Sequence, residues 1–186
     1  SKSNSCIFYC SFYWVVALAP LGFVFYLSAR LHKISFSTAQ TMFWLFAGIM
    51  GLSMAYIFIA FTGASIARVF FITAGTFAGM SLYGYTTKKD LSGWGSFLFM
   101  GLIGIIIASI VNIFLKSPML YYVISWIGVL VFVGLTAYDT QRIKEMYYAS
   151  DHPEISGKKA IMGALKLYLD FINLFIMLLH IFGQRR

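Results

Sequence analysis

The stretch AIMGALKLYLDFINLFIMLLHIF, residues 160–182, is a continuous apolar run with an aspartate, Asp170, inside it. A helix needs about 20 apolar residues to cross a membrane, so this run is long enough. A carboxylate in the hydrocarbon region is unfavourable by about 2.5–3.5 kcal/mol on insertion scales, and chains keep one where it lines a cavity, is paired or has a function. A second aspartate, Asp139, ends another apolar run, Tyr122–Tyr138. These two aspartates are therefore the candidate functional residues.

The composition is that of an integral membrane protein. Of the 186 residues, 60% are hydrophobic and 11% are charged, and the mean hydropathy is +0.82. An ordinary soluble domain has about 25% charged residues. The net charge of +8 comes from bases in short segments between apolar runs, a pattern that reflects orientation in a membrane and not nucleic-acid binding. We expect one polytopic membrane domain over residues 1–186, with the lipid bilayer as a partner and no nucleic acid.

Six apolar runs of helical length predict six membrane-spanning helices, because an open strand cannot satisfy its backbone polar groups in lipid. The runs are Ile7–Ser28, Thr38–Phe61, Ile66–Tyr85, Trp94–Leu115, Leu120–Tyr138 and Ala160–Phe182. The connections are short and polar, apart from Asp139–Lys159, which we interpret as a helix overhang followed by a solvated loop. The expected fold is an all-α membrane bundle.

The distribution of lysine and arginine predicts the orientation. Alternate connections hold eight bases on one side of the membrane and five on the other, and the richer side is expected to be cytoplasmic. The richer side has Arg30, Lys33, Lys88, Lys89, Arg142, Lys144, Lys158 and Lys159; the other has Lys2, Arg68, Lys116, Arg185 and Arg186.

Other polar residues inside the runs have structural interpretations. Lys166 lies four residues before Asp170, so both share one helix face. Lys166 either pairs with Asp170 or extends towards the membrane surface. Asn112 and Asn173 are expected to bridge helices by hydrogen bonds.

Small residues predict where helices pack closely. The patterns Gly75-x-x-x-Gly79 and Gly101-x-x-Gly104 would let backbones approach without side chains between them. Such spacing is frequent by chance in apolar helices. It therefore favours packing within the monomer over a dimer contact.

Several segments resemble the Bax inhibitor-1 family, also called the transmembrane Bax inhibitor motif family. The segments GLTAYDTQ and ALKLYLDFINLF, with IFG further on, resemble its last two helices; they are Gly134–Gln141, Ala164–Phe175 and Ile181–Gly183. Ser81–Ser92 and Asn112–Lys116 are similar to its bacterial branch, and the resemblance extends from about Leu27 to the C-terminus. It implies a bundle of seven helices in which six surround the last; six are visible here, so the first is missing or divergent.

The resemblance also implies a function and a set of site residues. Family members are pH-sensitive cation leaks, chiefly for calcium, in which two aspartates on the last two helices act as the sensor. Those positions correspond to Asp139 and Asp170, which would also be transient calcium ligands. In some members a base at the cytoplasmic end of the second helix interacts with this pair; Arg30 is the candidate, and Lys33 is the alternative. An acidic residue found in that helix in some relatives has no counterpart in Ile7–Ser28, so a proton or other cation leak stays open.

The chemistry of such a sensor follows from two close carboxylates. In a low dielectric both cannot ionise cheaply, so the pair retains a shared proton. That proton links two helices, and its gain or loss biases a two-state element. Calcium prefers about six to eight oxygen ligands, so water and carbonyl groups would have to complete its shell. Such a site favours transient passage, and no cofactor besides the permeant ion is expected.

Two other functions are compatible with the sequence. Bacterial members of this family include a partner and modulator of a membrane-bound AAA protease, which makes a regulatory role the main alternative. An intramembrane aspartyl protease is a minor one, because those enzymes place Gly-x-Gly before the second aspartate, where this chain has Leu167–Leu169. We therefore expect no enzymatic activity. The expected location is a bacterial inner membrane.

Overall fold

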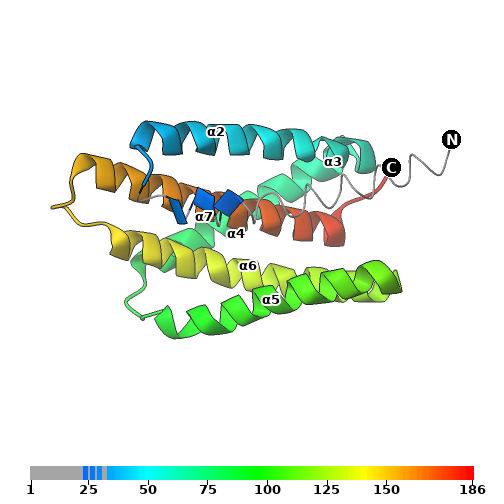
Figure 1. Cartoon of the computed structure of the whole chain (residues 1–186). Helices are drawn as coiled ribbons and strands as arrows, with labels where there is room; N and C mark the ends of the chain where they lie inside the picture. Colours follow the sequence, from blue (N-terminus) through cyan, green and yellow to red (C-terminus); the bar gives the residue numbers. More distant parts are fainter. Residues whose placement is uncertain (1–22, 25, 28, 31–32) are drawn as a thin grey trace.

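The computed structural model describes residues 23–24, 26–27, 29–30 and 33–186, and these residues form a bundle of helices (Figure 1). Within this part of the chain the only β-type pairing is an isolated bridge between Phe61 and Arg185. The helices are α2 (Phe36–Ser53), α3 (Ala55–Ala60), α4 (Gly63–Thr86), α5 (Ser92–Leu115), α6 (Pro118–Met146) and α7 (Pro153–Phe182). The predicted all-α fold is confirmed.

In the described part of the chain, five helical segments are long and apolar enough to cross a membrane; they are Phe36–Ala60, Gly63–Thr86, Ser92–Leu115, Pro118–Met146 and Pro153–Phe182. They match the last five predicted runs. The first predicted run, Ile7–Ser28, falls mostly outside the described residues, although Phe23 and Leu27 near its end are helical. The second run is divided at Met54 into α2 and α3. The Met54 N–H still donates to the Met50 carbonyl at 3.0 Å, so the division is a local irregularity within one span.

The connection between the last two helices is shorter than the sequence predicts. The overhang of α6 beyond Tyr138 is confirmed, but the solvated loop does not reach Lys159: α6 ends at Met146 and α7 begins at Pro153. Proline suits the first turn of a helix because its missing N–H has no helical partner there. Glu154 in the same turn complements the positive end of the helix dipole. Asp139 therefore lies inside a helix, two turns before its end.

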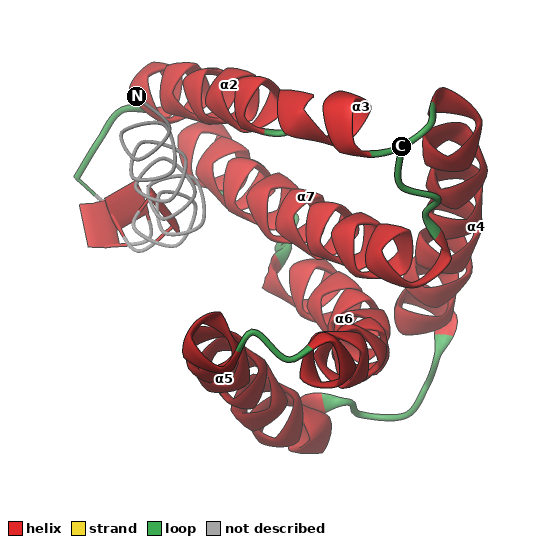
Figure 2. Cartoon of the chain, turned by 90° about the vertical axis from the view of Figure 1, so that its right-hand side faces the viewer, coloured by secondary structure: helices red, strands yellow, loops and turns green. Residues whose placement is uncertain are grey.

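Helix α7 occupies the centre of the described bundle, as the family resemblance implies. Figure 2 shows it between α2, α4 and α6, and it packs against each of these three, whereas α5 packs mainly on α6. The main apolar core combines residues of several helices around α7: Ile57, Phe61, Val69, Phe132, Leu174, Phe175, Leu178 and Leu179. Outward-facing side chains such as Leu52 and Phe114 are about four-fifths exposed (79% and 81%), as expected of residues that face lipid.

Close helix contacts form at some glycines and not at others. A side chain at Gly84 would collide with the backbone of Ala137, so α4 and α6 meet there without a side chain between them. Of the predicted Gly101-x-x-Gly104 pattern, Gly101 packs against the side chain of Val131, whereas a Cβ added at Gly104 would have no described atom within 4 Å. A Cβ added at Gly75 or Gly79 would also have no described atom within 4 Å, so the described residues do not form the close contact predicted there. Close approach depends on which face of α4 meets α6, and that rotation is not encoded in glycine spacing.

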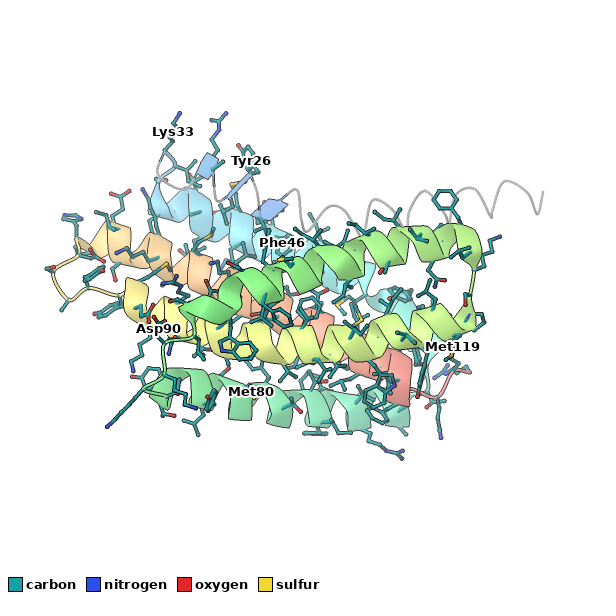
Figure 3. All side chains as sticks on the ribbon, turned by 90° about the horizontal axis from the view of Figure 1, so that it is seen from below. Tyr26, Lys33, Phe46, Met80, Asp90 and Met119 are labelled. Carbon is teal, nitrogen blue, oxygen red and sulfur yellow. The ribbon has the colours of Figure 1, made fainter. Side chains whose placement is uncertain are left out.

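The C-terminal segment closes one end of the bundle by backbone hydrogen bonds. The Arg186 N–H donates to the Ala60 carbonyl at 3.0 Å, and the Thr62 N–H donates to the Gln184 carbonyl at 3.1 Å. The Gln184 N–H also donates to Ser65 Oγ at 2.9 Å. The start of α2, the α4–α5 connection and the α6–α7 connection lie at the opposite end, where Figure 3 shows Lys33 and Asp90 far from Met119.

Candidate functional site

The antiparallel packing of α6 and α7 brings the two candidate aspartates together. The chain reverses at Tyr147–His152, so successive turns of α6 face turns of α7 in opposite order (Figure 1). Gly163 packs against Ile143 near this turn, and Gly128 packs against Met177 further along. Asp139 and Asp170 lie between these two contacts. The register of one helix pair therefore places two carboxyls that are far apart in the sequence at one depth of the bundle.

The two carboxyls are close enough to share a hydrogen bond. Asp170 is buried, with 5% of its surface exposed, and Asp139 is half-buried. Oδ2 of Asp170 is buried and receives no hydrogen bond from the described residues. An ionised carboxylate has acceptors only, so a bond within the pair requires one carboxyl to be protonated. The arrangement is thus two carboxyls held side by side between two helices, which can bind one proton between them.

Gln141 anchors the α4–α5 connection beside Asp139. Its Nε2 donates to the Lys89 carbonyl at 2.8 Å, and its Oε1 accepts from the Leu91 N–H at 2.8 Å. Gln141 is buried, with 7% exposed, so both ends of its amide are satisfied inside the protein. No role for Gln141 was predicted from the sequence. The available signal was a polar residue two positions after a candidate aspartate, in a predicted helix overhang.

Further contacts hold the same connection in place. Lys144 Nζ donates to the Tyr85 carbonyl at 2.7 Å, and the ring of Tyr138 lies where a side chain at Gly95 would be. Ser92 donates to the Asp90 carboxylate from its side chain and, at 2.8 Å, from its backbone, and these bonds lower the pKa of Asp90. Asp90 is fully exposed and is the acidic residue of the connection. Side chains of α6, the helix that carries Asp139, therefore hold the α4–α5 connection in place.

Lys166 lies near both carboxyls but forms no salt bridge with either. Its ammonium group interacts electrostatically with Asp139 and with Asp170. Among the described residues, the ion pairs within 4.0 Å are Arg142–Glu145, Lys158–Glu154 and Lys159–Asp151. The predicted helical spacing of Lys166 and Asp170 is present, while the direct ion pair that it permits is not formed.

The other predicted site residues lie apart from the pair or bond locally. Arg30 is exposed, with its guanidinium 5.8 Å from the centre of the Tyr26 ring, and Lys33 is also exposed. Asn112 Oδ1 accepts from the Ser117 N–H at 3.0 Å, which joins the end of α5 to the next turn. Asn173 Nδ2 donates to the Leu169 carbonyl at 2.8 Å within α7. In the part of the chain that the structure describes, the side-chain bonds of both asparagines are thus local and do not bridge the spans.

The capacity of the site for a cation rests on two carboxylates. No group of three or more His, Cys, Asp or Glu side chains in the described part of the chain could hold a metal ion. The buried hydroxyl of Thr136, one turn before Asp139, already donates to the Phe132 carbonyl at 2.7 Å. A cation at the pair would therefore take most of its ligands from water or from backbone carbonyl groups.

Comparison with known proteins gives a consistent set of relatives. The family described as "Inhibitor of apoptosis-promoting Bax1" matches residues 3–186. A Rickettsia prowazekii protein is 49% identical over 180 residues, which are 97% of this chain and 76% of the relative. The Escherichia coli K12 protein named inner membrane protein YbhL is 55% identical over 171 residues, 91% of this chain and 73% of the relative. A Caulobacter vibrioides protein is 49% identical over 180 residues, 94% of this chain and 70% of the relative.

Proposed function

Because the chain belongs to the Bax inhibitor-1 family, we propose that it is a pH-sensitive cation leak in which Asp139 and Asp170 bind the controlling proton. The observation that carries the proposal is the buried carboxyl pair between α6 and α7. The Escherichia coli relative YbhL is named an inner membrane protein, and we extend that location to this chain.

The proton count of the pair decides how the two helices interact. With one proton the pair forms a hydrogen bond that links α6 to α7. Without it, two negative charges face each other in a poorly solvated interior, where their repulsion is weakly screened. The two protonation states therefore favour different separations of the helices, which gives a two-state element that pH can bias.

The same carboxylates supply the attraction for a permeant cation. A cation at the pair replaces the shared proton as the positive charge between two carboxylates. Calcium is the expected ion, because hard oxygen ligands suit it, and the small number of protein ligands favours brief occupancy over storage. The apolar surroundings make an unoccupied, doubly ionised pair costly, so protons and cations compete for the site.

The direct test is flux through the purified protein in liposomes. We expect calcium entry above that of protein-free liposomes, with a rate that changes between about pH 6 and pH 8, where a carboxyl pair of this kind exchanges its proton. An absence of flux of any cation at every pH would contradict the proposal. The regulatory role beside a membrane protease would then be the function to test.

A further inference from the structure

Lys166 differs from the other lysines and arginines of α6 and α7. Both helices are described in full, and each of their other bases has an anionic or carbonyl partner: Arg142 with Glu145, Lys144 with the Tyr85 carbonyl, Lys158 with Glu154 and Lys159 with Asp151. Lys166 has no hydrogen bond and no ion pair within 4.0 Å among the described residues. It is half-buried, so its ammonium group is held near the pair with its charge uncompensated at close range.

The position of Lys166 directs that charge to the aspartate pair. It precedes Asp170 by four residues, which places the two side chains on one face of α7. Its electrostatic interaction with Asp139 reaches across to α6. Among the other helices that the structure describes in full, α2, α3 and α5 contain no charged residue, and the charged residue of α4 is Arg68, near its other end.

A count of charges shows what Lys166 does to the site. The pair with its shared proton carries one negative charge, and Lys166 brings the total to zero. With the proton lost, the total is one negative charge, which a monovalent cation neutralises and a divalent cation exceeds by one. Net charge is costly inside a membrane protein, so the neutral combinations are favoured.

We propose that Lys166 is a tethered counter-cation of the Asp139–Asp170 pair, which lowers the preference of this site for divalent over monovalent cations. The proposal rests on the proposed function of the pair as a cation pathway. Lys166 acts on the site through its positive charge. It is not a ligand of the cation, because its ammonium group has hydrogen-bond donors and no acceptor. Its half-buried position also leaves it able to extend towards the membrane surface when a cation enters, which limits its effect without removing it.

The test compares calcium and potassium flux in liposomes for Lys166→Met and Lys166→Arg. Methionine keeps most of the length and the apolar stem of lysine but removes the charge. The ratio of calcium to potassium flux should therefore rise by about ten-fold, the change that a modest charge interaction in a protein interior produces. Arginine keeps the charge, so its ratio should stay near that of the wild type. Lys158→Met is the matched control, since Lys158 lies two turns earlier on α7 and pairs with Glu154 at 3.1 Å. An unchanged ratio in Lys166→Met would overturn the counter-cation role.

Calcium binding separates this inference from the proposed function. Equilibrium dialysis of detergent-purified protein should give a calcium affinity about ten-fold higher for Lys166→Met than for the wild type. If no variant conducts any cation but this difference in affinity is found, the leak is excluded and the counter-cation role stands. Equal affinities overturn the role, whatever the flux. Lys166→Gln is a second neutral variant in case Lys166→Met does not yield a monodisperse, folded protein.

Discussion

The interface of α6 and α7 has two halves that differ in how their buried groups are satisfied. In the half far from the α6–α7 turn, Phe132, Leu174 and Leu178 are buried among apolar neighbours. In the half nearer the turn, Asp170 is buried with an oxygen that has no donor among the described residues, and Asp139 and Lys166 lie beside it. One pair of helices thus combines a largely apolar contact, which also includes the ring contact of Tyr121 with His180 at 4.7 Å, with a contact that contains two carboxyls.

In the proposed function, the difference assigns stability to one half of the interface and switching to the other. The apolar packing around Phe132, Leu174 and Leu178 is insensitive to pH, so in the proposed function it can hold the helices together in either protonation state of the pair. The hydrogen bonds of the C-terminal segment to Ala60, Thr62 and Ser65 reinforce that end. The half with the carboxyl pair can then change its separation without dissociation of the bundle. Variants in each half test this separation of roles, and we expect the largest effect at the buried aspartate.

Asp170→Asn should abolish the function of the half of the interface nearer the α6–α7 turn, which contains the carboxyl pair. Asparagine has nearly the same shape but no negative charge, so cation flux in proteoliposomes should fall to near the level of protein-free liposomes. The protein should stay folded, because removing a buried carboxylate does not create a cavity. The measurement is calcium uptake, with monodispersity in detergent as the folding control. Unchanged uptake would exclude the pair as the pathway.

Leu174→Ala should weaken the half of the interface far from the α6–α7 turn without altering the pH response of the carboxyl pair. Leu174 is fully buried, with 0% exposed. Truncation of a buried leucine to alanine destabilises proteins by about 2–5 kcal/mol. We expect a lower midpoint of thermal unfolding in detergent, together with a pH dependence of flux that has the wild-type shape. A shifted pH dependence in this variant would show that the two halves are coupled.

Asp139→Asn should change the pH response, because it leaves one carboxyl of the pair in place. The like-charge repulsion and the acid–carboxylate hydrogen bond are both lost, so the response should change in shape as well as size. We expect a shifted or flattened curve between about pH 6 and pH 8. Flux measured at a series of pH values tests this. A curve identical to that of the wild type would mean that the two carboxyls do not titrate together.

Asp90→Asn is the matched control, and we expect almost no effect. The hydrogen bonds from Ser92 lower the pKa of Asp90, so its carboxylate contributes stability above its unfolded pKa and loses that contribution only as pH falls through the lower folded value. Between about pH 6 and pH 8 it is therefore ionised throughout. The pH dependence of flux should match that of the wild type. A changed curve would show that a carboxylate of the α4–α5 connection contributes to the response.

Much of the fold could be predicted from the sequence, and so could the two aspartates of the candidate site. Apolar runs of sufficient length define where the chain can cross a membrane, because the cost of burying polar groups in lipid is local to each segment. The same cost makes Asp139 and Asp170 conspicuous, whatever the arrangement of the helices. Family membership could also be predicted, because the motifs around both aspartates can be recognised without coordinates.

Which of these residues meet depends on how the helices pack. Hydropathy does not determine how each helix is rotated about its axis, so spacing could not show that Gly84 and not Gly75 meets another described helix, that Gln141 binds the α4–α5 connection, or that Lys166 forms no ion pair with the described residues. Rotation and register are set by packing against neighbours that are distant in the sequence. The amino-acid sequence is therefore enough to locate the spans and their two carboxyls, while the packing of α6 on α7 makes those carboxyls a pair.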